Sequence, residues 1–170
     1  VIEAIDKNLY LLAQQEKYNS LAKNLKIIRN EQGFISSILD IKFGSAINSS
    51  FKKKENFDNI EFFPKDKFLD YNQYFVFTTA LSEKIYEITL AYSGENLITT
   101  KALTQNIIET VFETKFNNEL SLIYKNLYCC IEIEPNSNSL LLRFINIDLY
   151  NEHQTEKNQK AINEMDLDAL

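Results

Sequence analysis

The sequence predicts an α+β fold, in which a long N-terminal helix precedes a mainly antiparallel sheet with one packed central helix. Apolar residues recur at helical spacing near the N-terminus, aromatic and β-branched runs follow, and one amphipathic stretch interrupts those runs. At 170 residues the chain is long enough to build one sizeable core. We divide it into an N-terminal helix at 1–32, an α+β domain at 33–150 and an acidic polar tail or marginal helix at 151–170.

Residues 1–30 predict a helix with two apolar stripes, each at 3-4-3 spacing. The stripes are Ile2, Ile5, Leu9 and Leu12, and then Tyr18, Leu21, Leu25 and Ile28. They lie on nearly opposite sides of a straight helix, because each residue turns it by about 100°. Three explanations of the two stripes remain open. The helix has a kink near residues 14–17, or it packs on two partners, or its first half continues an upstream helix. We favour the last two. The first stripe is the predicted interaction surface for a protein partner.

Residues 34–43 have an apolar pattern that favours a short helix over a strand. Residues 44–59 are rich in turn-forming Ser and Asn and predict a loop, and residues 59–63 predict a strand that Pro64 ends. The loop contains a basic run, Lys52, Lys53 and Lys54. Contact with anionic lipid headgroups is one interpretation of this run, and a solvated loop is the other.

Two strands are predicted next. Residues 74–79 are aromatic or β-branched throughout, which is typical of a buried strand. Residues 84–90 alternate apolar and polar side chains, which predicts a strand with one face in solvent. A turn at 93–96 then leads to the central helix.

The central helix is predicted to begin at a cap formed by Thr99 or Thr100 and to end at Asn117 and Asn118. Its apolar positions form one stripe on one face. They are Leu103, Ile107, Ile108, Val111 and Phe112.

A hairpin and a returning strand complete the predicted sheet. Residues 120–124 and 127–133 are strands separated by Lys125 and Asn126, a spacing short enough for a tight turn. After a turn, residues 140–147 return against this hairpin as a further strand.

Residues 70–133 resemble a family of uncharacterised bacterial membrane-anchored proteins, often encoded near LemA-type proteins. Three runs carry the resemblance, and they follow one another in the same order in that family. The run D-Y-N-Q-Y-F-V-F at 70–77 resembles E-F-E-K-Y-F-V-V-Y, and the run I-T-T-K-A-L at 98–103 resembles I-L-T-P-A-L. The run E-L-S-L through L-Y at 119–128 resembles K-I-S-L-S-F…L-Y-I-A-I. Lys101 replaces the family's proline, and the stretch between the first two runs is longer. The resemblance implies an accessory domain tethered to a membrane, and it brings no catalytic residues.

Composition argues against several classes of function. A formal charge of −6 is unfavourable for a general nucleic-acid binder, and three Gly and two Pro argue against a glycine-rich nucleotide loop. No apolar run is long enough for a membrane span, and no signal peptide is evident. Because the chain begins at Val1, we interpret it as a soluble fragment whose N-terminal anchor has been removed, so that the full-length protein is membrane-associated.

Few side chains suggest chemistry. Cys129 and Cys130 are adjacent in a strand, so we expect one in the core and one facing outward or a second layer, and no metal ligands accompany them. The single histidine, His153, lies in the polar tail, where we expect an exposed surface residue. Glu132 and Glu134 share one strand face, where a cross-strand ion pair with Arg143 would explain them. No catalytic motif is present, so we predict no enzyme activity, cofactor or metal.

The leading functional hypothesis is a non-enzymatic domain of a bacterial membrane-anchored protein that works through protein contacts, with an oligomer possible. A minor pilin or pseudopilin ectodomain is an alternative, because in that fold a long N-terminal helix packs on an antiparallel sheet. A soluble ligand-binding protein with an aromatic pocket is a second alternative. The tyrosines of that pocket would be Tyr71, Tyr74, Tyr86, Tyr92 and Tyr128.

Overall fold

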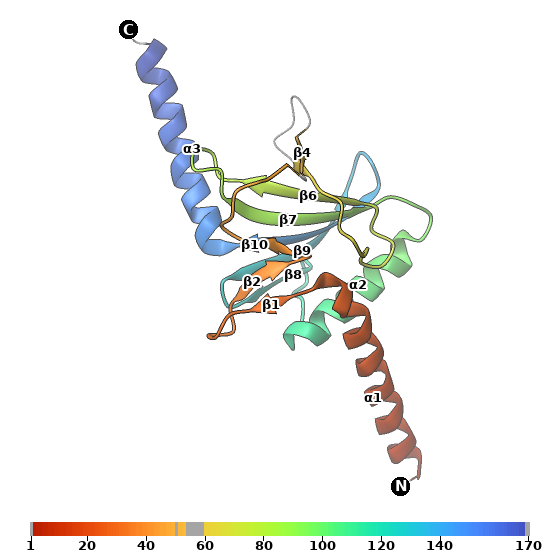
Figure 1. The fold of residues 1–170 in the computed structure, drawn as a ribbon. Helices are drawn as coiled ribbons and strands as arrows, with labels where there is room; N and C mark the ends of the chain where they lie inside the picture. The colour runs from red at the N-terminus through yellow and green to blue at the C-terminus, as the bar shows by residue number, and fades with distance from the viewer. Residues whose placement is uncertain (1, 50, 54–59, 169–170) are drawn as a thin grey trace.

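A seven-stranded sheet, in the order β4-β5-β6-β7-β10-β9-β8, forms the centre of the molecule (Figure 1). The computed structural model describes residues 2–49, 51–53 and 60–168. The strands are β4 (Lys52–Lys53), β5 (Ile60–Glu61), β6 (Gln73–Thr78), β7 (Ile85–Tyr92), β8 (Ser121–Tyr124), β9 (Leu127–Glu134) and β10 (Ser139–Asn146). Neighbouring strands run antiparallel throughout, which confirms the predicted α+β class with an antiparallel sheet.

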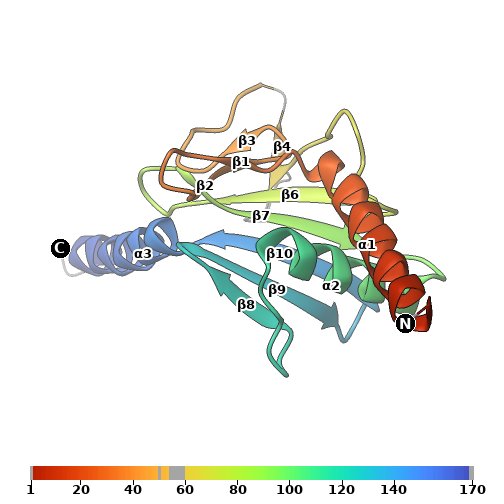
Figure 2. The same cartoon turned by 90° about the horizontal axis from the view of Figure 1, so that it is seen from below.

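A smaller three-stranded sheet and the helix α2 cover one face of the large sheet (Figure 2). The remaining elements are α1 (Ile2–Ala22), the 3-10 helix η1 (Lys23–Leu25), β1 (Ile28–Arg29), β2 (Ile35–Ile38), β3 (Ile41–Lys42), α2 (Leu97–Phe112) and α3 (Ile147–Asp168). The expected central helix is α2. It is not the only packed helix, because α1 contacts α2 and α3 contacts β7.

One hydrophobic core lies between the large sheet and the elements that cover it. Alternate residues of β6, β7, β9 and β10 form its sheet side, and α2, η1 and the small sheet close it. Its fully buried members include Leu25, Ile38, Ile88, Leu90, Ile107, Ile108, Leu140 and Phe144. Leu25 therefore belongs to the domain that we predicted to begin at residue 33.

The N-terminal helix is shorter than the predicted 1–30. It ends at Ala22, and Lys26 adopts a left-handed conformation with φ 49°. The change of direction places Leu25 in the core, while Ile28 enters β1 and is 53% exposed. The second predicted stripe is therefore divided between a helix and a strand.

The helix predicted for residues 34–43 is wrong, because β2 and β3 form a hairpin there. Leu39 and Asp40 occupy its turn with φ values of 54° and 63°, as a two-residue primed turn requires. Leu39 is buried and its N–H donates to the Leu25 carbonyl at 2.7 Å, so tertiary packing supports a turn that carries no glycine. The predicted loop at 44–59 contains β4, and residues 50 and 54–59 lie outside the described residues.

The central helix is displaced from its predicted ends. It begins at Leu97, after Asn96, which makes no side-chain capping hydrogen bond. It ends at Phe112, where Glu113 adopts φ 51°. Of the predicted stripe, Ile107, Ile108 and Phe112 are buried, while Leu103 and Val111 are half-buried.

The C-terminal segment is a helix that starts before the predicted boundary at residue 151. Its first turns pack on the sheet, with Leu149 against the core and His153 half-buried. Residues 157–165 are exposed along their whole length. The helices α1 and α3 extend from the sheet in opposite directions (Figure 1).

Candidate functional site

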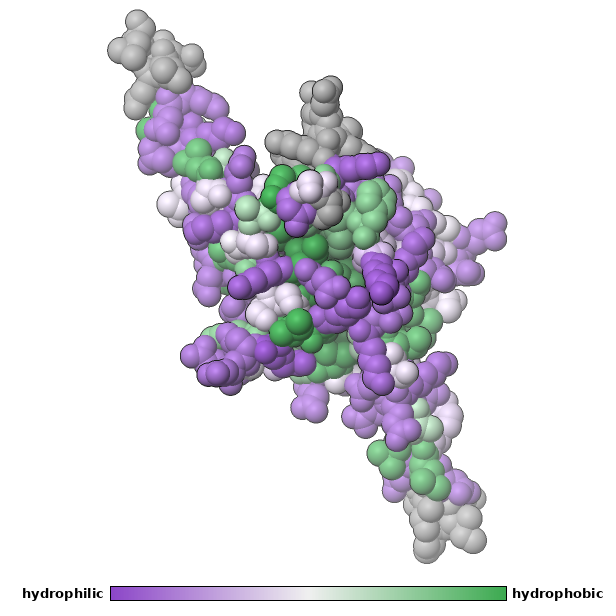
Figure 3. All heavy atoms as spheres, viewed as in Figure 1, coloured by the Kyte–Doolittle hydropathy of each residue, from purple (hydrophilic) through white to green (hydrophobic). Residues whose placement is uncertain are grey.

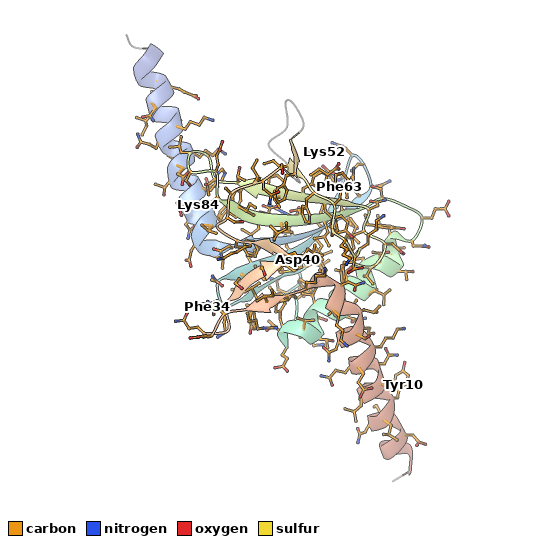
Figure 4. All side chains as sticks on the ribbon, in the orientation of Figure 1. Tyr10, Phe34, Asp40, Lys52, Phe63 and Lys84 are labelled. Carbon is orange, nitrogen blue, oxygen red and sulfur yellow. The ribbon has the colours of Figure 1, made fainter. Side chains whose placement is uncertain are left out.

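The N-terminal part of α1 extends beyond the domain as an exposed apolar segment. We call residues 9–12 the α1 arm; their four large side chains are 54–62% exposed. They are Leu9, Tyr10, Leu11 and Leu12. In Figure 4 Tyr10 lies on this extended part of α1, and Figure 3 shows apolar residues between polar ones there.

The α1 arm is not wholly clear of the domain, because Leu11 lines a shallow hollow together with Glu109, Thr110 and Glu113 beside it. Among the side chains described from residue 6 onward, Gln14 is the first that is half-buried, and Tyr18 and Leu21 follow at helical spacing toward α2. Residues 6–13 are all exposed. The last turns of α1 therefore carry its buried contacts with the domain, and the four side chains of the arm stay more than half exposed.

The predicted interaction stripe is only partly described. Leu9 and Leu12 lie on the exposed arm, and the side chains of Ile2 and Ile5 lie outside the described residues. Tyr10 and Leu11 are outside the predicted stripe, because that stripe follows one side of the helix. The available signal was the uninterrupted run of four large apolar residues, which no single face of a helix can hold.

Of the three lysines predicted to contact an anionic surface, the structure describes one side chain, that of Lys52. Lys52 is exposed, and its ammonium lies 5.6 Å from the ring centroid of Phe63, as their positions in Figure 4 indicate. The side chain of Lys53 and the whole of Lys54 lie outside the described residues. This cation–π contact with Phe63 gives Lys52 a local packing role on the domain surface.

The five tyrosines considered for an aromatic pocket do not line one cavity. Tyr71, Tyr74 and Tyr92 are buried in the core with their hydroxyl groups bonded. Tyr71 bonds with the Thr104 hydroxyl at 2.8 Å, and Tyr74 donates to the Tyr71 carbonyl at 2.9 Å. Tyr86 instead packs against α3.

The strand β7 is buried along its whole length, so the prediction that one of its faces lies in solvent is wrong. On the sheet face opposite the core, α3 covers Tyr86, and a polar network holds Glu87 and Thr89. Arg143 donates to Glu87 through Nε and Nη2, both at 3.0 Å, and through Nη1 to Glu132 at 3.0 Å. Thr89 also donates to Glu87, at 2.5 Å. The predicted pair of Glu132 with Arg143 is present, and Glu87 is the partner that was missed.

Both cysteines are buried free thiols, Cys129 in the core and Cys130 on the opposite face of the sheet. Burial raises the pKa of Cys129 well above its ordinary value. Burial, and then the charge of Glu132, raises the pKa of Cys130 to about 12. Because the thiolate is the reactive form, this arrangement disfavours a nucleophilic or redox role at neutral pH.

Two glutamates of α3 hold the loop between β6 and β7. The Glu156 carboxylate accepts the N–H groups of Leu81 and Ser82, at 2.7 and 2.6 Å, and the Ser82 hydroxyl at 2.7 Å. One turn earlier, Glu152 pairs with Lys84 at 2.9 Å; Figure 4 shows Lys84 beside α3. Burial by itself would raise the pKa of Glu156, but the bonds from Ser82 and Leu81 lower it to about 2. We call this set of contacts the α3 clasp.

The histidine next to the clasp is half-buried, so the expectation of an exposed surface residue is wrong. The His153 ring stacks on Tyr86 with 4.5 Å between the ring centroids and 16° between the planes. The stack lies between α3 and β7, at the point where the pairing of β7 with β6 shifts register. His153 therefore has a packing role in attaching α3.

Among the described residues, no group of three or more His, Cys, Asp or Glu side chains is arranged to hold a metal ion. In the same part of the chain, no helix combines the length and hydropathy needed to cross a bilayer. Comparisons of the chain with protein-family models, with curated proteins and with solved structures found no match.

Proposed function

We propose that this chain is a non-enzymatic protein-interaction module whose α1 arm inserts between helices of a partner protein. The observation that carries the proposal is the exposed run of four large apolar side chains on a helix that extends away from its own domain. Contiguous apolar surface of this kind marks interaction sites in soluble proteins.

The distribution of these side chains around the helix defines the kind of partner. Four consecutive helical residues spread over about 300° of the helix circumference. A helix that is apolar on all sides is normally buried on all sides, whereas docking in a single groove needs one stripe. The α1 arm therefore suits a site formed by two or more partner helices.

Burial of the α1 arm would supply enough free energy for specific association. Fully burying one leucine side chain contributes about 1.5–3 kcal/mol. Leu9, Leu11 and Leu12 are each more than half exposed, so most of that contribution is still available. Polar residues flank the arm, with Asp6 to Asn8 before it and Gln14 to Lys17 after it, and they would set the ends of the contact.

The proposal includes a membrane setting for the full-length protein, which the resemblance of residues 70–133 to a membrane-anchored family supports. The pilin alternative calls for a long helix seated on the sheet. In this protein α1 packs mainly against α2, so the arrangement gives the interaction module more support.

The test is site-specific photocrosslinking of the full-length native protein in its own cells. A photoreactive residue at position 9 or 12 should yield one discrete adduct with a second protein, identified by mass spectrometry, and position 162 serves as control. Ile162 is a matched control because it is 51% exposed on the exposed part of α3. Leu9→Ser with Leu12→Ser should abolish the adduct formed through position 11, and Ile162→Ser should leave it intact. Equal adducts from positions 9 and 162, or an adduct only with a second copy of this chain, would contradict the proposal.

A further inference from the structure

A groove of about 500 Å³ lies beside the α3 clasp, between α3 and the ends of β6 and β7. Three residues of the sheet line its apolar side: Ile60 and Tyr86, which are buried, and Phe77, which is half-buried. His153, Lys157 and Lys160 line it from α3. These three are four and three residues apart, so one face of α3 forms this wall.

The clasp leaves a local excess of positive charge at this groove. The acidic residues of the same helix segment are engaged elsewhere, Glu152 with Lys84 and Glu156 with the N–H groups of the loop. Lys157 and Lys160 are exposed, and no described carboxylate lies within ion-pair distance of either ammonium. Two lysines and one carboxylate, that of Glu83, line the groove, although the whole chain carries a formal charge of −6.

The apolar side of the groove is held in place. Tyr86 is fixed by its stack on His153, and Ile60 pairs with β6 opposite Val76. The groove has a volume within the range of small-molecule sites, and its lining combines a small apolar surface with a larger share of polar groups. A lysine ammonium on a flexible stem can reach the anionic group of such a ligand.

We propose that this groove binds a small amphipathic carboxylate. Its carboxylate would lie between Lys157 and Lys160, and its aliphatic or aromatic body would lie against Phe77 and Tyr86. The charge of the lysines favours an anionic group, and the apolar side adds affinity only for a ligand with an apolar body, which small inorganic anions lack. The site is independent of the proposed function, because it lies at α3 and involves no residue of the α1 arm.

The test is a fluorescence titration of the whole chain with dansyl-aminoundecanoate, followed by competition with unlabelled decanoate, decanol and decylamine. We expect saturable binding of one probe per chain. Decanoate should compete at least tenfold better than decanol or decylamine, which share its chain length. Lys157→Gln with Lys160→Gln should weaken probe binding at least tenfold. Lys7→Gln with Lys17→Gln, which removes two exposed lysines from α1, makes the same change in net charge and should leave the affinity unchanged.

Several results would overturn the proposal. These are no saturable binding, equal competition by decanol and decanoate, or equal loss of affinity in the two lysine variants. A hexaglutamate peptide that displaces the probe better than decanoate would assign the groove to an acidic segment instead. The amide resonances of Thr78, Ala80 and Lys157 should shift on adding decanoate, and shifts confined to the α1 arm would contradict the location.

Discussion

Arg143 on β10 holds the carboxylate of Glu87 on β7 through two hydrogen bonds of 3.0 Å, on the sheet face that α2 does not cover. Glu87 is 3% exposed. Its charge is accommodated there because Arg143 and Thr89 together satisfy both carboxylate oxygens. A buried carboxylate with a single cationic partner makes that partner important for stability.

Arg143→Met should destabilise the fold by about 3 kcal/mol, because it leaves Glu87 buried without its counter-ion. Replacing both partners, with Glu87→Leu and Arg143→Met, should recover most of the loss, because apolar groups need no counter-ion. Glu132→Gln is the matched control, since the Glu132 side chain is 47% exposed and its removal should cost less than about 1 kcal/mol. Urea unfolding measures all three, and an unchanged midpoint for Arg143→Met would contradict this role.

The α3 clasp should make stability depend on acidic pH. Glu156 has its pKa lowered from 4.5 to about 2, so the folded state favours the ionised carboxylate. Its contribution is complete above pH 4.5 and is lost as the pH falls toward 2. The difference in unfolding free energy between the wild type and Glu156→Gln should therefore be constant at neutral pH and decrease across this window. A difference that stays constant down to pH 2 would show that ionisation of Glu156 does not stabilise the fold.

The two thiols should be unreactive in the folded protein. Burial raises the pKa of both, that of Cys130 to about 12, so little thiolate exists at pH 8. Ellman's reagent should label neither cysteine rapidly in the native chain and both in guanidinium chloride. Rapid labelling of one thiol without unfolding would mean that the face of the sheet above Cys130 opens readily.

The leucines of the α1 arm should be dispensable for folding. Leu9→Ser with Leu12→Ser should change the free energy of unfolding by less than about 1 kcal/mol, because exposed side chains contribute little. Leu25→Ala should cost about 2–5 kcal/mol, because Leu25 is fully buried. Denaturant unfolding compares the two. A cost for the arm variant as large as that of Leu25→Ala would mean that the arm packs on its own domain.

The elements predicted correctly are those that depend on residues close together in the sequence. Tyr124 and Leu127 pair across Lys125 and Asn126 as expected, because two strands separated by two residues leave few alternatives. The hairpin at Leu39 and Asp40 was missed because its turn lacks Gly and Asn and is held by contacts with Leu25.

The faces of the sheet were harder to predict than its strands. Glu87 looked like a solvent-facing residue because periodicity does not reveal what covers a face. Its partner Arg143 lies 56 residues away in the sequence. The groove at Lys157 and Lys160 was missed for the same reason, since it exists only where α3 passes the ends of β6 and β7.

The connection of α3 to the sheet has a mechanical consequence. The helix continues directly from β10, which lies between β7 and β9, and α1 leaves the molecule on the opposite side (Figure 1). Tension applied between the two helices would enter the large sheet, at its α3 end, through an inner strand. That strand must slide past two neighbours at once before it separates, whereas an edge strand can peel away one bond at a time. At the α1 end the same tension would reach β1, a two-residue edge strand of the small sheet, so α1 and β1 would detach before β10 does.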